Sequence, residues 1–330
     1  MKSINKQKLA QVLKQWSGKY AVMAPTDKGG ATSFNKWEDG QEVKLENNST
    51  VPAKSVFFPQ TEELYRYKVE KDTIELKEVA PIENEMLVFG IRPCDLKSLD
   101  ILDDLFLTRG FVDVPYKAKR DNAAIVSYLC DKPCRYCFCE SLGIDYQKAK
   151  SADVAMCFDG ENFGFTAQTE KGESLLKEIE SLTEEKEVTL PQKQEFKLKA
   201  NLSGLAEKIA QMFEDPYWDT AYKGCMGCAA CTYVCPTCHC FDVNSHNRAS
   251  GAGFKTRCWD SCMFPDYTLM AGDHNPRPTR KERFRNRFLH KLQQFPERYG
   301  KIACVGCGRC ISKCPANVDI TKVISQLYSQ

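Results

Sequence analysis

Two cysteine runs constrain this 330-residue chain more than any other feature of its sequence. The first is Cys225-Met-Gly-Cys228-Ala-Ala-Cys231-Thr-Tyr-Val-Cys235-Pro236, and the second is Cys304-Val-Gly-Cys307-Gly-Arg-Cys310-Ile-Ser-Lys-Cys314-Pro315. Both have the spacing C-x2-C-x2-C-x3-C-P, which is typical of proteins that hold two [4Fe–4S] clusters. In such pairs three thiolates of one run bind one cubane, and the fourth binds the cubane of the other run. Proline resists continuing a helix, so it turns the chain after the last ligand.

This spacing predicts two [4Fe–4S] clusters with exchanged fourth ligands. The ligands of the first are Cys225, Cys228, Cys231 and Cys314, and those of the second are Cys304, Cys307, Cys310 and Cys235. Paired C-x2-C units also suit tetrahedral zinc sites. The third cysteine at the same spacing, the trailing Cys-Pro and the repetition of the whole pattern favour iron–sulfur clusters over zinc.

Composition narrows the cellular setting. The 46 basic and 44 acidic residues nearly cancel, so net charge gives no sign of a nucleic-acid or membrane partner. A chain of this length suits two domains and does not need its eighteen cysteines as disulfides. Ligand thiols must stay reduced, which predicts a cytoplasmic protein of an anaerobe. The polar start shows no signal peptide, and the apolar runs are too short to span a membrane.

The first half of the chain has the pattern of an α/β unit. Apolar runs at Met86–Ile91 and Ala123–Leu129 predict buried strands on either side of a helix in which Asp95 is the N-cap. Strand–helix–strand order favours parallel pairing of the two strands. The other expected elements are an amphipathic helix within residues 1–17, a strand at Tyr20–Ala24, a loop or hairpin at 35–50, and a hairpin turning at Asp159-Gly160.

The second half has a different pattern. Residues 169–200 are rich in Glu and Lys and predict a surface helix and a connector, followed by a helix at 202–214. Beyond it we expect short helices, turns and ligand loops. The predicted fold is therefore α+β with two domains. Residues 1–200 form an α/β domain with an additional iron–sulfur site, and residues 201–330 form a mainly α-helical dicluster ferredoxin domain.

A second group of cysteines follows the two predicted parallel strands. Cys94 comes after the first strand, and Cys130, Cys134, Cys137 and Cys139 come after the second. If the strands are neighbours, both loops lie at the same edge of the sheet, where α/β folds place their sites. Five cysteines so placed favour a third iron–sulfur cluster over zinc or structural thiols. Spacing leaves open which four of them bind.

Other candidates have weaker signals. Cys238, Cys240, Cys258 and Cys262 either ligate another metal or, as we favour, line a cluster pocket. Cys157 is expected to be a small core residue. A basic segment is expected to be a solvated helix face, or else to dock an acidic partner or raise a cluster potential; it comprises Arg277, Arg280, Lys281, Arg283, Arg285, Arg287 and Lys291. The four histidines show no ligand spacing.

The chain lacks the sequence marks of substrate chemistry. It has no G-x-G-x-x-G run, no P-loop and no evident nucleophile–base pair. We therefore interpret it as an electron-transfer subunit. The alternatives are a redox enzyme with its own substrate-binding cluster and a zinc-stabilised nucleic-acid or scaffold module.

Several segments resemble one known family. They are Phe57-Phe58-Pro59-Gln60-Thr61-Glu62, Gly90-Ile91-Arg92-Pro93-Cys94-Asp95, Cys137-Phe138-Cys139, Cys235-Pro236-Thr237-Cys238-His239-Cys240, Trp259-Asp260-Ser261-Cys262 and Cys304-Val305-Gly306-Cys307-Gly308-Arg309-Cys310. The family is the dicluster [4Fe–4S] ferredoxin-like family that contains the β subunit of cytosolic NiFe sulfhydrogenases and one of the subunits of anaerobic sulfite reductase.

This resemblance implies a hetero-oligomeric complex. The chain would pass electrons between a flavoprotein partner of the NAD(P)H- or ferredoxin-reductase type and a catalytic hydrogenase, sulfite reductase or heterodisulfide-type subunit. It also implies Cys94, Cys130, Cys137 and Cys139 as the ligands of the third cluster. Cys134 and Cys258 are additional to the family pattern, and residues 140–200 are unmatched.

Overall fold

Two β-sheets organise the chain, which the computed structural model describes at residues 1–78 and 85–329. The larger sheet has eight strands, in the spatial order β10 (Glu184–Glu185), β1 (Lys2–Asn5), β9 (Asn162–Ala167), β8 (Val154–Phe158), β7 (Ala123–Tyr128), β6 (Met86–Ile91), β2 (Ala21–Lys28) and β3 (Ala31–Lys36). Its four central strands, from β8 to β2, are parallel to one another, and the pairs outside them are antiparallel. The predicted parallel pairing of the two apolar runs is therefore confirmed.

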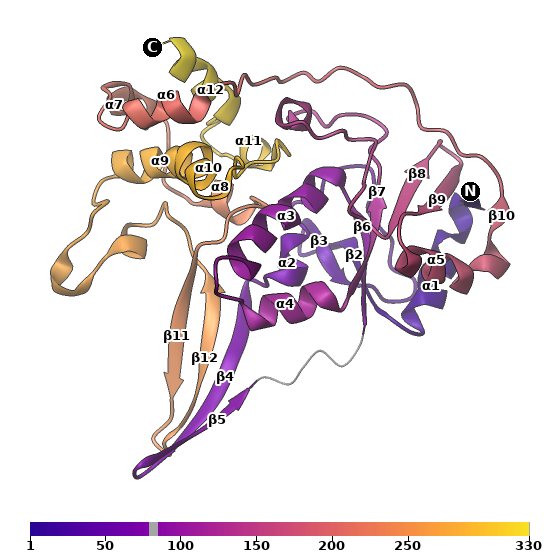
Figure 1. Cartoon of the computed structure of the whole chain (residues 1–330), viewed down its shortest axis with the longest axis horizontal. Helices are drawn as coiled ribbons and strands as arrows, with labels where there is room; N and C mark the ends of the chain where they lie inside the picture. The colour runs from indigo at the N-terminus through magenta and orange to yellow at the C-terminus, as the bar shows by residue number, and fades with distance from the viewer. Residues whose placement is uncertain (79–84, 330) are drawn as a thin grey trace.

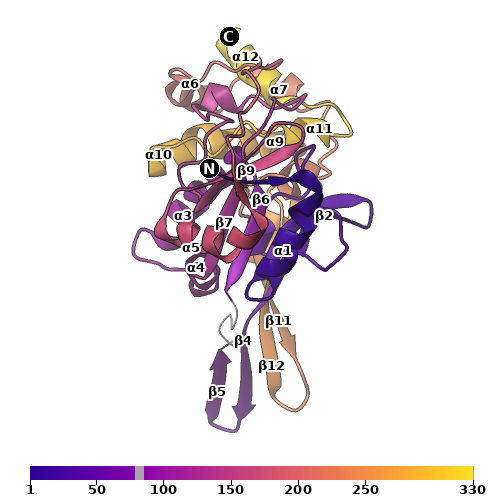
Figure 2. The ribbon, with the colours of Figure 1, turned by 90° about the vertical axis from the view of Figure 1, so that its right-hand side faces the viewer.

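Helices cover both faces of this sheet (Figures 1 and 2). Leu13 and Trp16 of α1 pack on one face together with Leu175 of α5, and Leu99 of α3 packs on the other with Tyr116 of α4. Central strands buried on both faces explain why their sequences are continuous apolar runs. The helices are α1 (Leu9–Ser17), α2 (Lys54–Phe57), α3 (Pro93–Leu107), α4 (Val114–Asp121) and α5 (Glu170–Glu178).

Short helices gather at one end of the molecule, where the later part of the chain lies (Figure 1). They pack around their own apolar cluster, which contains Trp218, Phe284, Phe288 and Leu292. These helices are α6 (Leu205–Gln211), α7 (Tyr217–Ala221), α8 (Ala230–Tyr233), α9 (Arg280–Leu289), α10 (Phe295–Tyr299), α11 (Arg309–Ser312) and α12 (Ile320–Ser329). A π-helical turn at residues 290–294 joins α9 to α10.

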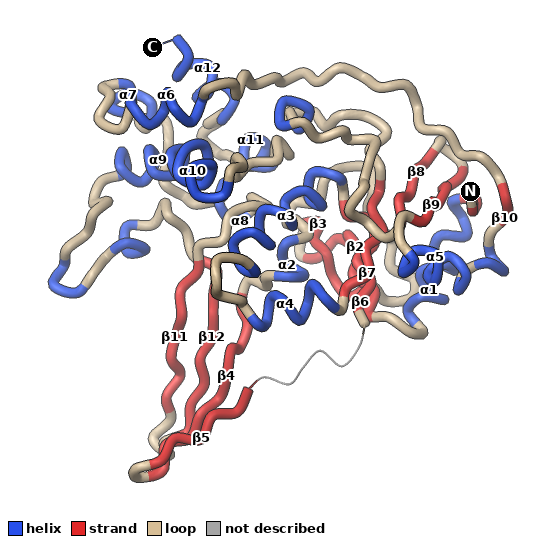
Figure 3. The backbone as a smooth tube through the Cα atoms, in the orientation of Figure 1, coloured by secondary structure: helices blue, strands red, loops and turns tan. Residues whose placement is uncertain are grey.

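The smaller sheet projects from the body as an arm (Figure 3). It is antiparallel, in the order β11 (Phe241–Asn247), β12 (Ala252–Trp259), β4 (Thr61–Glu70) and β5 (Thr73–Glu78). The expectation of short helices, turns and ligand loops beyond residue 214 is wrong at 241–259. Because β11 is exposed along its whole length, it lacks the apolar alternation that marks a half-buried strand.

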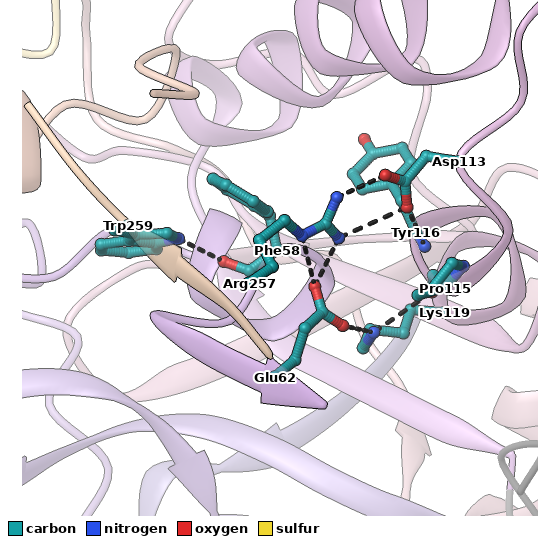
Figure 4. Close-up of polar contacts among 8 residues, drawn as sticks. All are labelled: Phe58, Glu62, Asp113, Pro115, Tyr116, Lys119, Arg257 and Trp259. Carbon is teal, nitrogen blue, oxygen red and sulfur yellow. Dashed lines mark hydrogen bonds and ion pairs between the residues drawn. The ribbon is translucent and has the colours of Figure 1, made fainter. Parts of the chain in front are cut away.

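A buried ion-pair network fixes the base of the arm (Figure 4). Arg257 of β12 bonds the carboxylates of Glu62 on β4 and Asp113 at the start of α4. Lys119 of α4 also reaches Glu62, at 2.7 Å. The indole of Trp259 donates to the carbonyl of Phe58 at 3.1 Å. The arm thus joins strands from both sides of the predicted division at residue 200, and that division stays a prediction.

Candidate metal centres

The first cavity lies between the two cysteine runs. Its walls carry the sulfur-bearing side chains of Cys225, Cys228, Cys231 and Cys314, with Phe284 and Phe288 as an apolar backing. The third cysteine of each run lies on a single helical turn, α8 or α11, and these two turns pack against each other. Backbone amides donate to sulfur here, from Gly227 to Cys225 at 3.4 Å and from Val318 to Cys314 at 3.2 Å.

The second cavity has the reciprocal composition. Cys304, Cys307 and Cys310 line it together with Cys235 of the earlier run. The amide of Gly306 lies 3.5 Å from the sulfur of Cys304, which repeats the amide–sulfur contact of the first cavity. Each cavity thus gathers three cysteines from one run and one from the other. The quartets predicted from the sequence are brought together, and their ligation of clusters stays a prediction.

Buried cations test whether these residues suit an iron–sulfur cluster. Nε of Arg287 donates to the sulfur of Cys231 at 3.1 Å, and Nζ of Lys291 donates to the sulfur of Cys235 at 3.4 Å. Among the described residues, neither cation pairs with a carboxylate, and cysteines are the anionic groups that act on both. A buried cation without a negative neighbour is strongly disfavoured. A thiolate-bound cluster is an anion, so the residues present fit one.

The geometry around single ions is different. Within the described residues, no three His, Cys, Asp or Glu side chains are grouped as one metal ion requires. The cysteines instead stand around the walls of cavities, with apolar side chains between them.

A third group of cysteines lies at the carboxyl edge of the parallel strands. Cys94 opens α3 directly after β6, and Cys130 follows β7, its neighbour in the sheet. Both belong to one buried cluster with Cys137 and Cys139, against which Cys134 packs. The guanidinium of Arg92 donates to the sulfur of Cys130 at 3.3 Å, as the cations do at the other two sites. Burial raises the pKa of the Cys94 thiol, so this thiol needs a positive partner to ionise.

The third group touches the second cavity directly. The amide of Phe138 donates to the carbonyl of Gly306 at 2.7 Å, and Phe138 also lines the second cavity. A Cβ atom at Gly306 would lie 2.6 Å from the amide nitrogen of Cys139, and one at Gly308 would lie 2.4 Å from backbone atoms of Tyr136. Both glycines also have positive φ, at 61° and 72°. Glycine therefore allows the two cysteine loops to touch, which sequence reasoning did not foresee.

A buried ion pair ties α3 to α11. Arg309 donates to Asp95 in a bidentate contact, with Nη2 and Oδ2 at 2.6 Å, and its Nε donates to the carbonyl of Ser49 at 2.7 Å. The prediction that Asp95 caps α3 is wrong. Arg92 occupies the N-cap position, and the carboxylate of Asp95 in the first turn compensates the buried guanidinium of Arg309.

The later part of the chain matches a known domain family, and most of the chain matches a known subunit. Residues 224–318 match the family described as 4Fe-4S dicluster domain. The whole chain is 32% identical over 318 residues to sulfhydrogenase 2 subunit beta of Pyrococcus furiosus. The match covers 93% of this chain and 92% of that protein. This chain belongs to the dicluster family of the sulfhydrogenase β subunits. No solved structure matches it.

Membership of this family makes the chain an iron–sulfur electron-transfer subunit that carries [4Fe–4S] clusters. The suspected resemblance is therefore confirmed. None of the helices at residues 1–78 and 85–329 combines the length and apolar character that crossing a membrane requires.

The basic segment before the second run differs from its prediction. Arg283, Arg285, Arg287 and Lys291 are buried, so a solvated helix face is wrong for these four residues. Arg283 donates to backbone carbonyls, among them that of Pro278 at 2.8 Å, while Arg287 and Lys291 face cysteines. A count of charge along the sequence cannot distinguish cations that face water from cations that face sulfur.

The remaining cysteines separate into two kinds. Cys238, Cys240 and Cys262 line a further cavity with His239 and His290. A hydrogen bond from Cys262 lowers the pKa of Cys240 to about 6, whereas burial lowers the pKa of His239 to about 3 and of His290 to about 4. Both imidazoles are therefore neutral at physiological pH. By contrast, Cys258 lies on β12, and Cys157 is buried in β8 as the small core residue that was predicted.

Proposed function

We propose that this subunit relays electrons between a flavoprotein partner, which exchanges electrons with NAD(P)H or a ferredoxin, and a separate catalytic redox subunit. The catalytic partner would be of the hydrogenase, sulfite reductase or heterodisulfide type, in a cytoplasmic hetero-oligomer. The observation that carries the proposal is the reciprocal sharing of cysteines between the first and second cavities. Two centres that share their ligands in this way lie close together, and closeness is what electron transfer needs.

Three clusters belong to the proposal. Cys225, Cys228, Cys231 and Cys314 would hold the first, and Cys304, Cys307, Cys310 and Cys235 the second. Cys94, Cys130, Cys137 and Cys139 would hold the third, with Cys134 beside them. The third would belong to an α/β domain of residues 1–200, and the first two to a mainly helical domain of residues 201–330. The shared arm would then be the joint between these domains.

The contacts between the sites support a linear relay. Phe138 and Gly306 connect the third group to the second cavity, and Cys310 and Arg287 line both the second and the first. Next to the first cavity, Met226 and Cys228 are exposed, so this end of the relay reaches the surface. We infer that one redox partner docks over Met226.

The surrounding protein has three tasks in this relay. A bound cubane supplies one-electron chemistry with its charge spread over iron and sulfide. The phenyl rings of Phe284 and Phe288 exclude water from the first cavity, and the amides of Gly227, Gly306 and Val318 donate to ligand sulfurs. Arg287, Lys291 and Arg92 place positive charge beside sulfur and thereby favour the reduced, more negative state.

Purification under anaerobic conditions tests the proposal. The protein should be brown, contain about 12 irons per chain for three cubanes, and bleach on addition of dithionite. The purified protein should then accept electrons from a flavoprotein reductase that is isolated with it from the native host. A colourless protein loaded with zinc would contradict the cluster assignment. A brown protein that exchanges electrons with no co-purifying partner would contradict the relay.

A further inference from the structure

Three cysteines outside the proposed cluster sites surround a cavity of their own. Cys238, Cys240 and Cys262 line it, and none of the three lines the first or second cavity. Two of them are brought together by the register of the β11–β12 hairpin. Phe241 pairs with Trp259, and the amide of Asp260 donates to the carbonyl of Cys240 at 3.0 Å. The base of the hairpin therefore closes with Cys240 and Cys262 on the same cavity.

A buried lysine from a distant part of the chain faces this group. Lys54 of α2 has only 2% of its surface exposed, and its Nζ donates to the carbonyl of Cys238 at 2.7 Å. The ammonium lies 4.1 Å from the centre of the Trp259 ring. Among the described residues, no carboxylate pairs with Lys54; its electrostatic partners of opposite sign are Cys238, Cys235 and Cys240.

The same arrangement recurs at each proposed cluster. Arg287 contacts Cys231 at the first site, Lys291 contacts Cys235 at the second, and Arg92 contacts Cys130 at the third. Each of these cations is buried, and none of them has a carboxylate partner among the described residues. Lys54 has the same relation to the remaining cysteines. Arg287 and Lys291 also line this cavity, so it collects positive charge that calls for a negative occupant.

We propose that Cys238, Cys240 and Cys262 bind a fourth iron–sulfur cluster. The cluster would be held by three thiolates, because no fourth cysteine lines the cavity within the described residues. Cys258 is the nearest in sequence, but it pairs with Asp242 and Thr61 within the arm. A single metal ion fits less well, since no three ligands among the described residues are grouped for one. This inference extends the proposed relay by one centre and rests on the chain being loaded with clusters.

Metal analysis of matched serine variants tests the fourth site. The Cys240→Ser/Cys262→Ser double variant and a Cys258→Ser control are purified anaerobically, and iron and acid-labile sulfide are measured with the EPR spectrum of the reduced protein. With four cubanes the wild type should contain about 16 irons, the double variant about 12, and the control as much as the wild type. The EPR signals of the other clusters should persist in the double variant. Unchanged iron in the double variant, or an equal loss in the control, overturns the proposal.

A second variant keeps the test decisive if the double variant does not fold. Lys54→Met removes the charge and retains all cysteines, with a side chain of similar length. It should shift the midpoint potential of one EPR signal to more negative values and leave the others in place. If no potential changes, or if all change equally, the fourth site is overturned. A chain that binds no iron at all would instead contradict the proposed function, so the two failures are distinguishable.

Discussion

The eight-stranded sheet and the cysteine region differ in what fills their interiors; by the cysteine region we mean residues 205–329 together with the loop 130–139. Apolar and aromatic side chains fill both layers beside the sheet. In the cysteine region, buried basic side chains and thiols lie among the apolar ones. Eight basic residues are buried among the described parts of the chain, against the single buried carboxylate of Asp95. The sheet is stabilised by apolar burial, whereas the interior of the cysteine region needs a negatively charged occupant.

Removal of iron should separate the two regions most strongly. Anaerobic chelation leaves buried cations such as Arg287 and Lys291 facing empty cavities, while the core of β6, β7 and β8 is untouched. Hydrogen exchange should accelerate by about 100-fold or more at residues 225–235 and 304–314. Amides of the central sheet strands should keep their protection. Equal loss of protection in both regions would show that the sheet also depends on the clusters.

Two serine substitutions sharpen the same comparison. Cys314→Ser removes a thiol of the first cavity, and Cys157→Ser removes a buried thiol of β8. Cys314→Ser should lose about four irons, or lose part of one cluster, in a quantitative iron assay. Cys157→Ser should retain the wild-type iron content, since its sulfur contacts only carbonyls of Gly164 and Val188. Iron loss in both variants would break the distinction between ligand and core cysteines.

The ion pair between the two regions can be cut by one atom exchange. Asp95→Asn leaves the Arg309 guanidinium buried without its carboxylate. The free energy of unfolding should fall by about 3–5 kcal/mol, measured by denaturant titration of the holoprotein under anaerobic conditions. Asp100→Asn is the control, because its partner Lys97 is exposed. A matching loss in the control would show that charge removal from α3, rather than the buried pair, is responsible.

A matched pair of leucines gives the smallest expected effect on stability. Leu99 in the sheet core and Leu292 in the cysteine region are both fully buried. Either change to alanine should cost about 2–5 kcal/mol of stability. Leu99→Ala should lower the melting temperature and keep its iron, whereas Leu292→Ala should release iron faster on chelator challenge. If the two variants release iron at the same rate, the regions are not independent.

The central strands and the cysteine quartets were predictable because their signals are local. Residues 86–91 and 123–128 are continuous apolar runs, and ligand spacing is written directly in the two cysteine runs. The arm was not predictable, because β11 is exposed along its length and β5 likewise buries no residue. The approach of Phe138 to Gly306 and the burial of Arg287 depend on contacts between residues far apart in sequence, which periodicity does not encode.

The arm sets a condition on how the protein can be made. Its central ladder pairs β4 with β12, and the network at its base joins residues 195 positions apart. During synthesis, β4 leaves the ribosome long before its partner exists, and pairings of such long range form slowly. The loop 235–240, which carries the proposed ligands Cys235, Cys238 and Cys240, leads straight into β11. We therefore expect the nascent chain to hold these thiols apart until the final third has emerged, so that metal insertion follows translation.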